Sequence, residues 1–317
     1  TDTLKRFICF DNEDYFQVDL IGALANQNLR ANSSIDYIVI SPKAFLSQAE
    51  ELGQLHQTYD GLNYLVADQA EIFNEFSSGR QDPVAIRDFV KHLYDKSLAA
   101  AVTPPQYLLL FGDGTYDPLG HENSDNTNFI LTYESEMSVD PVKSYVSDDF
   151  FGFLDDDEGA DIGANDAGQI DIGIGRMPIG SVTEANTMVA KVKAYLEGTY
   201  GNWKNNITFV ADDEDNNIHL EDAEILAKTV ADRYPYMNID KIYFDAYPQE
   251  NAAGGERYPD VQKAINNKMF SGSFIVNYTG HGGELGWAHE RVLNMSDIRS
   301  WTNIDKLPLF MTATCEF

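Results

Sequence analysis

Apolar runs typical of buried strands alternate with segments of helical periodicity along the first half of the chain. In the helical segment that begins at Asp82, the aspartate can cap the helix and Pro83 suits its first position. The predicted strands cover residues 37–40, 63–67 and 106–111, and the predicted helices cover residues 44–55 and 82–94. This β-α-β-α-β order predicts a parallel sheet with helices on its faces.

The second half shows the same α/β pattern, although the sequence itself does not repeat. Its predicted strands cover residues 169–176, 207–211, 241–244, 274–278 and 307–314, and its predicted helices cover residues 182–195 and 222–234. We place the division near Ser147. The sequence therefore predicts two side-by-side α/β units, residues 1–146 and residues 147–317, each with a mainly parallel sheet and flanking helices.

Charge and composition narrow the range of partners. The chain has 51 acidic and 22 basic residues, and its formal net charge of −29 argues against nucleic acid and anionic membranes as partners. No run of 18 apolar residues is present and the first residues do not resemble a signal peptide, so we expect a mature or excised soluble portion of a protein. The two cysteines, Cys9 and Cys315, cannot form a disulfide scaffold and leave the compartment open.

The last two predicted strands each end beside a residue with catalytic chemistry. Strand 274–278 stops at a glycine-rich turn that contains His281, and strand 307–314 runs directly into Cys315. If these strands are parallel neighbours, the imidazole and the thiol emerge at one edge of the sheet, where open α/β sheets place their active sites. A thiol with a pKa of ~8.5 is a weak nucleophile until a nearby base takes its proton. A core histidine beside a structural cysteine is the alternative that these residue types leave open.

Neighbouring residues extend this hypothesis. Gly282 has no Cβ, so its backbone N–H and that of Cys315 could bind the oxyanion of a tetrahedral intermediate. Cys9 lies in an apolar run and is better explained as a small core residue than as the nucleophile. Trp287 is either a packing residue or a wall of the substrate pocket. We expect His289 on the surface, with a role as the base as the lesser alternative.

Four motifs in order along the chain resemble the gingipain family of cysteine peptidases. They cover residues 107–117, 147–152, 171–178 and 277–282, and Cys315 follows 34 positions after His281. The resemblance covers most of the chain and implies a caspase-like, gingipain-type fold in which the second unit carries the chemistry. It also implies that Asp171 hydrogen-bonds His281 and fixes its tautomer. A solvent-facing acid on a strand is the alternative for Asp171.

Within the family, residues 282–286 and 290–293 are more similar to the sortase of the type IX secretion system than to the secreted peptidases. This similarity implies an enzyme that cleaves C-terminal sorting signals from secreted cargo proteins and passes the acyl group to water or to an amine of surface lipopolysaccharide. The implied partners are those cargo proteins, lipopolysaccharide and other subunits of the secretion system. The implied location is the cell surface, or the extracellular side of the outer membrane, of a Gram-negative bacterium.

Two alternative functions stay open. One is a secreted gingipain-like endopeptidase that uses the same cysteine and histidine, and the other is a catalytically silent, calcium-stabilised scaffold of the secretion machine. The chain ends two residues after Cys315, whereas the catalytic domain of the family continues. We therefore expect a truncated catalytic unit, and we do not transfer the arginine or lysine preference of the secreted members.

Acidic residues gather in loops at the ends of predicted strands, where glycine and asparagine also offer backbone carbonyls. Hard oxygen ligands of this kind suit Ca²⁺, and the family resemblance also implies calcium. The alternative for each cluster is a solvated acidic surface. The predicted calcium ligands are Asp113, Asp117, Asp148, Asp149, Asp155, Asp157, Asp212 and Asp213.

Overall fold

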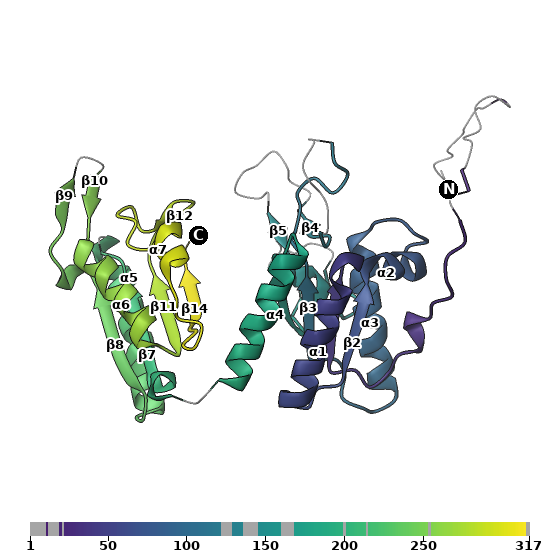
Figure 1. The fold of residues 1–317 in the computed structure, drawn as a ribbon, viewed down its shortest axis with the longest axis horizontal. Helices are drawn as coiled ribbons and strands as arrows, with labels where there is room; N and C mark the ends of the chain where they lie inside the picture. The colour runs from purple at the N-terminus through teal and green to yellow at the C-terminus, as the bar shows by residue number, and fades with distance from the viewer. Residues whose placement is uncertain are drawn as a thin grey trace, which may run out of the picture.

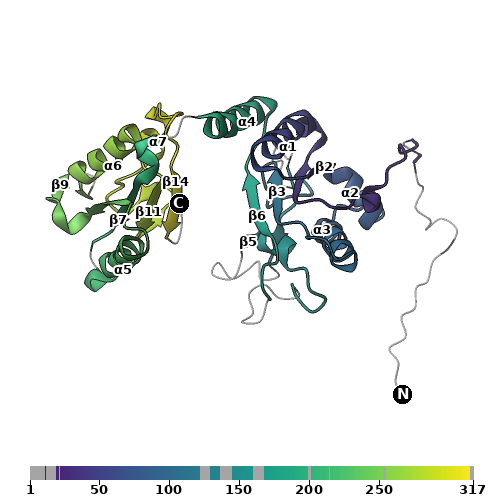
Figure 2. The same ribbon diagram turned by 90° about the horizontal axis from the view of Figure 1, so that it is seen from below.

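The computed structural model describes residues 11, 19–20, 22–121, 129–135, 145–159, 168–198, 201–213, 215–252 and 255–314. Figures 1 and 2 show two α/β units, and each is built on a four-stranded sheet. All strand pairs within these two sheets are parallel. The predicted α/β architecture, with parallel sheets and flanking helices, is therefore confirmed.

The first sheet has the strand order β2-β1-β3-β6. Ile38 and Ile40 face one core with α2 and α3, whereas Tyr37 and Val39 face another with α1 and α4, because successive side chains of a strand point to opposite faces. The elements of this unit are β1 (Tyr37–Ser41), β2 (Tyr64–Asp68), β3 (Tyr107–Phe111), β6 (Gly173–Met177), α1 (Leu46–Asp60), α2 (Gln69–Phe76), α3 (Pro83–Ala99) and α4 (Val182–Glu197).

The predicted division after residue 146 is wrong, because the first unit continues through β6 and α4. Strand β6 pairs in parallel with β3. Helix α4 packs on the face that α1 covers, where Ala185 and Val189 are buried, and Gln48 of α1 donates a hydrogen bond to Asn186 of α4 at 3.0 Å. The pattern of apolar residues predicts both β6 and α4 correctly. It does not indicate which sheet β6 joins. The first unit therefore extends to Glu197.

The second sheet has the strand order β14-β11-β7-β8. Helix α6 packs against one face together with residues around α7, and α5 covers the other face. The elements of this unit are β7 (Asn206–Ala211), β8 (Asn238–Tyr243), β9 (Glu250–Ala252), β10 (Gly255–Arg257), β11 (Ile275–Thr279), β12 (Gly282–Gly283), β13 (Gly286–Trp287), β14 (Leu309–Ala313), α5 (Ile218–Arg233), α6 (Pro259–Ser271) and α7 (Met295–Ser300).

Short elements complete the described chain. Strands β4 (Tyr133–Glu134) and β5 (Val146–Ser147) form a two-stranded pair. The 3₁₀ helices are η1 (Leu29–Ala31), η2 (Lys43–Phe45), η3 (Asp149–Gly152), η4 (Asn202–Asn205), η5 (Asp215–Asn217) and η6 (Phe244–Ala246). Within the described ranges, none of the helices combines the length and the apolar character that crossing a bilayer requires.

The predicted pairing of the two motif strands is confirmed. Strands β11 and β14 are parallel neighbours, in a register that runs from Ile275 opposite Leu309 to Thr279 opposite Ala313. Both strands therefore reach the same edge of the sheet at their carboxyl ends. His281 follows β11 by two residues at that edge, and the described chain continues past β14 to Thr314, the residue before Cys315.

Candidate active site

The turn that carries His281 begins at a glycine that the packing requires. A Cβ on Gly280 would lie 2.5 Å from both the Cβ of Asp212 and the hydroxyl oxygen of Tyr278, which is closer than real side chains approach. Asp212 follows β7, and its backbone N–H donates to the carbonyl of Thr279 at 3.1 Å. A backbone hydrogen bond thus joins the carboxyl ends of β7 and β11 next to His281.

Both backbone groups of His281 are held by side chains or by the following hairpin. Its N–H donates to Asp212 Oδ2 at 2.9 Å. Its carbonyl accepts the hydroxyl of Tyr278 at 2.6 Å and the N–H of Ala288 at 2.8 Å. Burial and the neighbouring Asp212 carboxylate raise the pKa of Tyr278, so this phenol stays protonated and donates. The position of the imidazole is therefore set by a rigid backbone.

Trp287 is a packing residue. Its side chain is fully buried, and its ring stacks on that of Tyr278 with centroids 4.3 Å apart and planes 8° apart. Its backbone pairs with Leu293, and a Cβ on Gly286 would clash with the Leu293 carbonyl at 2.2 Å. The ring of Trp287 also contacts that of Phe310 in β14 edge-on, so the β12–β13 hairpin packs against both β11 and β14. It carries the glycines that surround the histidine.

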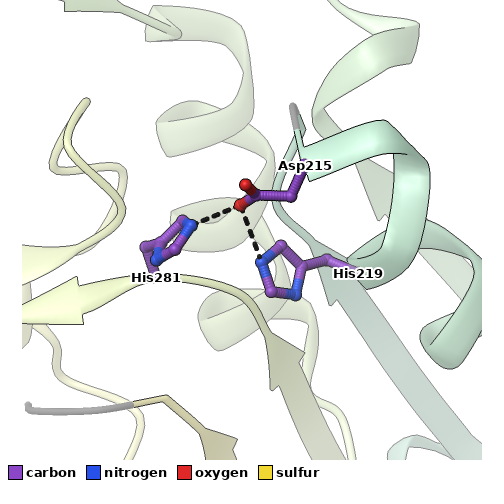
Figure 3. Close-up of side chains that lie close together, drawn as sticks. All are labelled: Asp215, His219 and His281. Carbon is purple, nitrogen blue, oxygen red and sulfur yellow. Dashed lines mark hydrogen bonds and ion pairs between the residues drawn. The ribbon is translucent and has the colours of Figure 1, made fainter.

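The imidazole of His281 is paired with a carboxylate that follows strand β7. His281 Nε2 lies 2.5 Å from Asp215 Oδ2, and Figure 3 shows the two side chains in contact. Asp215, Asn216 and Asn217 all have positive φ angles, of 43°, 56° and 67°, and this left-handed run sits between β7 and α5. Short polar side chains tolerate that conformation better than others do. The hydrogen bond with His281 lowers the pKa of the Asp215 carboxyl.

Asp171 does not occupy the predicted position beside His281. Its carboxylate accepts the backbone N–H of Leu154 at 3.1 Å and lies 3.5 Å from the hydroxyl of Tyr94, both in the first unit. The reason is topological, since β6, which Asp171 precedes, adds to the first sheet. Asp215 takes the predicted place of Asp171. The signal that could have identified it is the acidic run after β7, the strand next to β11.

Gly282, the predicted oxyanion donor, follows His281 directly in the chain. It opens strand β12 opposite Trp287 and lines a cavity of about 360 Å³ together with His281, Leu285 and His289. His289 is exposed, as predicted, and its ring stacks on that of His281 with centroids 5.6 Å apart. Cys315 and Cys9 lie outside the described residues, so their predicted roles, and the oxyanion contact of Gly282, stay predictions.

A second acidic cluster lies behind the His281 backbone. Asp212, Asp213 and Glu290 each bring a carboxylate oxygen within 4.8 Å of the others, and Asp212 and Glu290 are 5% and 6% exposed. Burial, and then repulsion by Asp213, raises the pKa of Asp212, while the N–H of His281 opposes this shift. The hydroxyl of Tyr258 donates to Asp213 at 2.7 Å. Three hard oxygens at this spacing have the chemistry that Ca²⁺ prefers.

The other six predicted calcium ligands are not brought together in this way. In the ranges that the structure describes, none of them belongs to a group of three carboxylates or imidazoles at metal-ligand spacing. Asp148 instead forms a bidentate pair with Arg176, at 2.7 and 2.8 Å. Asp117 accepts the N–H of His121 at 2.8 Å. The remaining four are Asp113, Asp149, Asp155 and Asp157.

Comparisons with known proteins agree with this architecture. Residues 30–317 match the sequence model of peptidase family C25. The gingipain R structure, an Arg-specific cysteine proteinase, is 20% identical over 92% of this chain and 56% of its own, with a TM-score of 0.61. The complex of RgpB pro- and mature domains from Porphyromonas gingivalis is 21% identical over 88% of this chain and 55% of its own, with a TM-score of 0.59. These similarities confirm that this chain has the caspase-like fold of the gingipains.

A third similar structure is dimeric latent PorU from Porphyromonas gingivalis. It is 36% identical over 55% of this chain and 17% of its own, with a TM-score of 0.49. No curated protein matches the sequence. The chain spans between 17% and 56% of the length of these three solved chains.

Proposed function

The chain belongs to peptidase family C25, and from this premise we propose that it carries the catalytic site of a cysteine peptidase. Cys315 is the nucleophile, His281 is the base, and Asp215 orients the base. One observation supports this assignment most strongly. His281 stands at the carboxyl end of β11, held by Asp215, and the neighbouring parallel strand β14 leads towards Cys315.

The contact with Asp215 determines which nitrogen of His281 can act. Because Nε2 lies against the carboxylate, it carries the proton, and the lone pair is then on Nδ1. Nδ1 takes the proton of the Cys315 thiol, and the thiolate attacks the carbonyl carbon of the scissile peptide bond. When the C–N bond breaks, the imidazolium returns a proton to the leaving amine and a thioester remains on Cys315. Asp215 stabilises the imidazolium between these steps.

The developing negative charge on the substrate oxygen needs hydrogen-bond donors. We assign this role to the backbone N–H groups of Gly282 and Cys315. The position of Gly282 supports the assignment, since it borders the cavity beside His281 and the rigid hairpin holds it there. A fixed N–H costs no reorganisation when the charge appears, which is the source of its catalytic effect.

We propose further that the thioester is resolved by transfer as well as by hydrolysis. The support is the sequence of residues 282–286 and 290–293, which resembles the type IX sortase. Residues 282–286 and Arg291 also line the cavity beside His281. The substrates are then proteins with a C-terminal sorting signal, and the acceptor is water or an amine of lipopolysaccharide. This activity belongs on the outer side of the outer membrane of a Gram-negative bacterium, next to other subunits of the secretion system.

A secreted gingipain-like endopeptidase is the second candidate, since it would use the same Cys315 and His281. A silent scaffold stabilised by calcium is the third, and the Asp212–Asp213–Glu290 cluster is the group that would hold its ion. Calcium stays a prediction in all three cases. An ion at this cluster would stabilise the turn, because Asp212 binds the His281 backbone.

The choice between transfer and hydrolysis is tested with the full-length protein, a cargo peptide that includes its sorting signal, and an amine at increasing concentration. Mass spectrometry of the products should show an amide whose share rises with amine, because a bound acceptor competes with water at a high effective concentration. Cys315→Ala should give neither product, and Cys9→Ala should give both. If only the acid forms at every amine concentration, and unrelated peptides are cut equally well, the endopeptidase replaces the sortase.

A further inference from the structure

Two imidazoles converge on a single carboxylate oxygen beside the proposed active site. His281 Nε2 is 2.5 Å from Asp215 Oδ2, and His219 Nε2 is 3.4 Å from the same oxygen (Figure 3). All three ligand atoms lie within 4.8 Å of one another. His219 comes from the first turn of α5, whereas His281 comes from the turn after β11. The proposed peptidase mechanism uses one of these imidazoles and gives no role to the other.

The Nε2 atom of His219 faces Asp215 but makes no hydrogen bond with it. The His219 side chain is 20% exposed, and Nε2 itself is buried with no hydrogen-bond partner among the residues that the structure describes, since the contact with Asp215 lacks hydrogen-bond geometry. Leaving a buried polar atom unsatisfied costs about 1–3 kcal/mol. A metal ion would accept the lone pair of this nitrogen. The orientation of His219 towards Asp215 therefore indicates a ligand rather than a packing role.

We propose that Asp215, His219 and His281 form a binding site for a Zn²⁺ ion that switches the peptidase off. Two imidazole nitrogens and one carboxylate oxygen are a donor set that zinc uses, with a fourth position left for water. Hard Ca²⁺ prefers oxygen, so it would select the separate Asp212–Asp213–Glu290 cluster instead. The side chains of Asp215 and His281 are 47% and 42% exposed, so an ion can reach them from solvent.

The site needs little rearrangement to hold the ion. Zinc bonds of about 2.0–2.1 Å in a tetrahedron place ligand atoms about 3.3 Å apart. The His219–Asp215 separation of 3.4 Å already matches this value. The His281–Asp215 separation of 2.5 Å would have to widen by about 0.8 Å, since 3.3 minus 2.5 is 0.8. Rotations of exposed side chains are enough for a change of this size.

Inhibition follows from the tautomer of His281, and this part of the inference rests on the proposed function. A neutral imidazole has one protonated nitrogen and one lone pair. When zinc takes the lone pair of Nε2, the remaining proton must sit on Nδ1. Nδ1 can then no longer accept the proton of Cys315, and the ion also removes Asp215 from its orienting contact. Zinc would therefore block the base without touching the thiol.

Direct binding is tested by titration calorimetry of Zn²⁺ into the full-length Cys315→Ala protein, which lacks the other obvious zinc ligand, in a buffer with excess Ca²⁺. One site is expected. His219→Ala and the size-conserving His219→Gln should each weaken it at least about 100-fold, since even residues behind the ligands cost 10- to 100-fold when removed. His289→Ala is the matched control, because His289 stacks on His281 but is not in the cluster, and it should bind normally.

Zinc affinity that is unchanged in both His219 variants, or that is lost equally in His289→Ala, would overturn the site. The active protein then tests the consequence. Zinc should inhibit peptide cleavage, and the His219→Gln variant should need at least about 10-fold more zinc for half-inhibition. If zinc binds through His219 and cleavage is unaffected at saturation, the metal site stands while the assignment of His281 as the base fails.

Discussion

Replacing Gly280 by alanine tests how the structure positions the proposed base. The added Cβ would lie 2.5 Å from the Cβ of Asp212 and 2.5 and 2.8 Å from the hydroxyl oxygen and Cζ of Tyr278. Both neighbours are buried and neither can swing into solvent, since Tyr278 is 0% exposed and Asp212 is 5% exposed. The variant must therefore shift the same two side chains that hold the backbone of His281.

The magnitude follows from two contributions. Overpacking a well-packed core costs about 1–3 kcal/mol. Weakening the 2.6 Å hydrogen bond from Tyr278 to the His281 carbonyl adds about 0.5–1.5 kcal/mol. The free energy of unfolding of the second unit should therefore fall by roughly 1.5–4.5 kcal/mol. Peptide cleavage should fall as well, because the imidazole moves with its backbone.

Denaturant unfolding, monitored by tryptophan fluorescence, measures the free energy of unfolding of the second unit. All three tryptophans, Trp203, Trp287 and Trp301, belong to the second unit, so the signal reports on that unit. Gly283→Ala is the matched control, because a Cβ at Gly283 would have no atom of the described residues within 4 Å. A Gly280→Ala protein as stable and as active as Gly283→Ala would refute the account of this turn.

The remaining predictions concern the partner of the base and the acidic cluster. Asp215→Asn should lower kcat about 10- to 100-fold with little change in KM; an equivalent change at a buried triad aspartate costs about 10⁴-fold, but Asp215 is 47% exposed and more screened. Asp171→Asn should leave kcat unchanged, and the opposite ranking in steady-state kinetics would restore Asp171 as the partner. Chelation of calcium should lower the melting temperature, since an ion present at 100 times its Kd contributes about 2.7 kcal/mol. Asp213→Asn should abolish that dependence, and identical melting curves with and without chelator, in a protein free of metal by elemental analysis, would refute calcium binding at this cluster.

Much of the fold follows from local patterns in the sequence. The apolar run before His281 and the run before Cys315 predict strands β11 and β14, and their parallel pairing brings the carboxyl ends of both strands to one sheet edge. Asp82 and Pro83 begin α3 as predicted, and the Asp82 side chain accepts the N–H of Val84. Helix α6 was not predicted, although Val261, Ile265 and Met269 show its buried stripe.

The features that the sequence did not predict depend on contacts between distant segments. Strand β6 reads as a strand from its residues, yet only its register against β3 assigns it to the first sheet. For this reason Asp171 lies among residues of the first unit and not beside His281. Asp215 reaches His281 because β7 lies next to β11 and because three successive residues adopt left-handed backbone angles. Neither condition can be read from hydrophobic periodicity, which reports burial along one segment at a time.

Selective alkylation of the two cysteines tests the central claim most directly. The full-length protein is treated with iodoacetamide at neutral pH, and the rate at each cysteine is measured by peptide mass spectrometry. A thiol whose proton is taken by His281 should react much faster than Cys9, and His281→Ala should slow the reaction at Cys315 while His289→Ala does not. Preferential labelling of Cys9, or a rate at Cys315 that is the same in His281→Ala as in the unmodified sequence, would contradict the assignment of nucleophile and base.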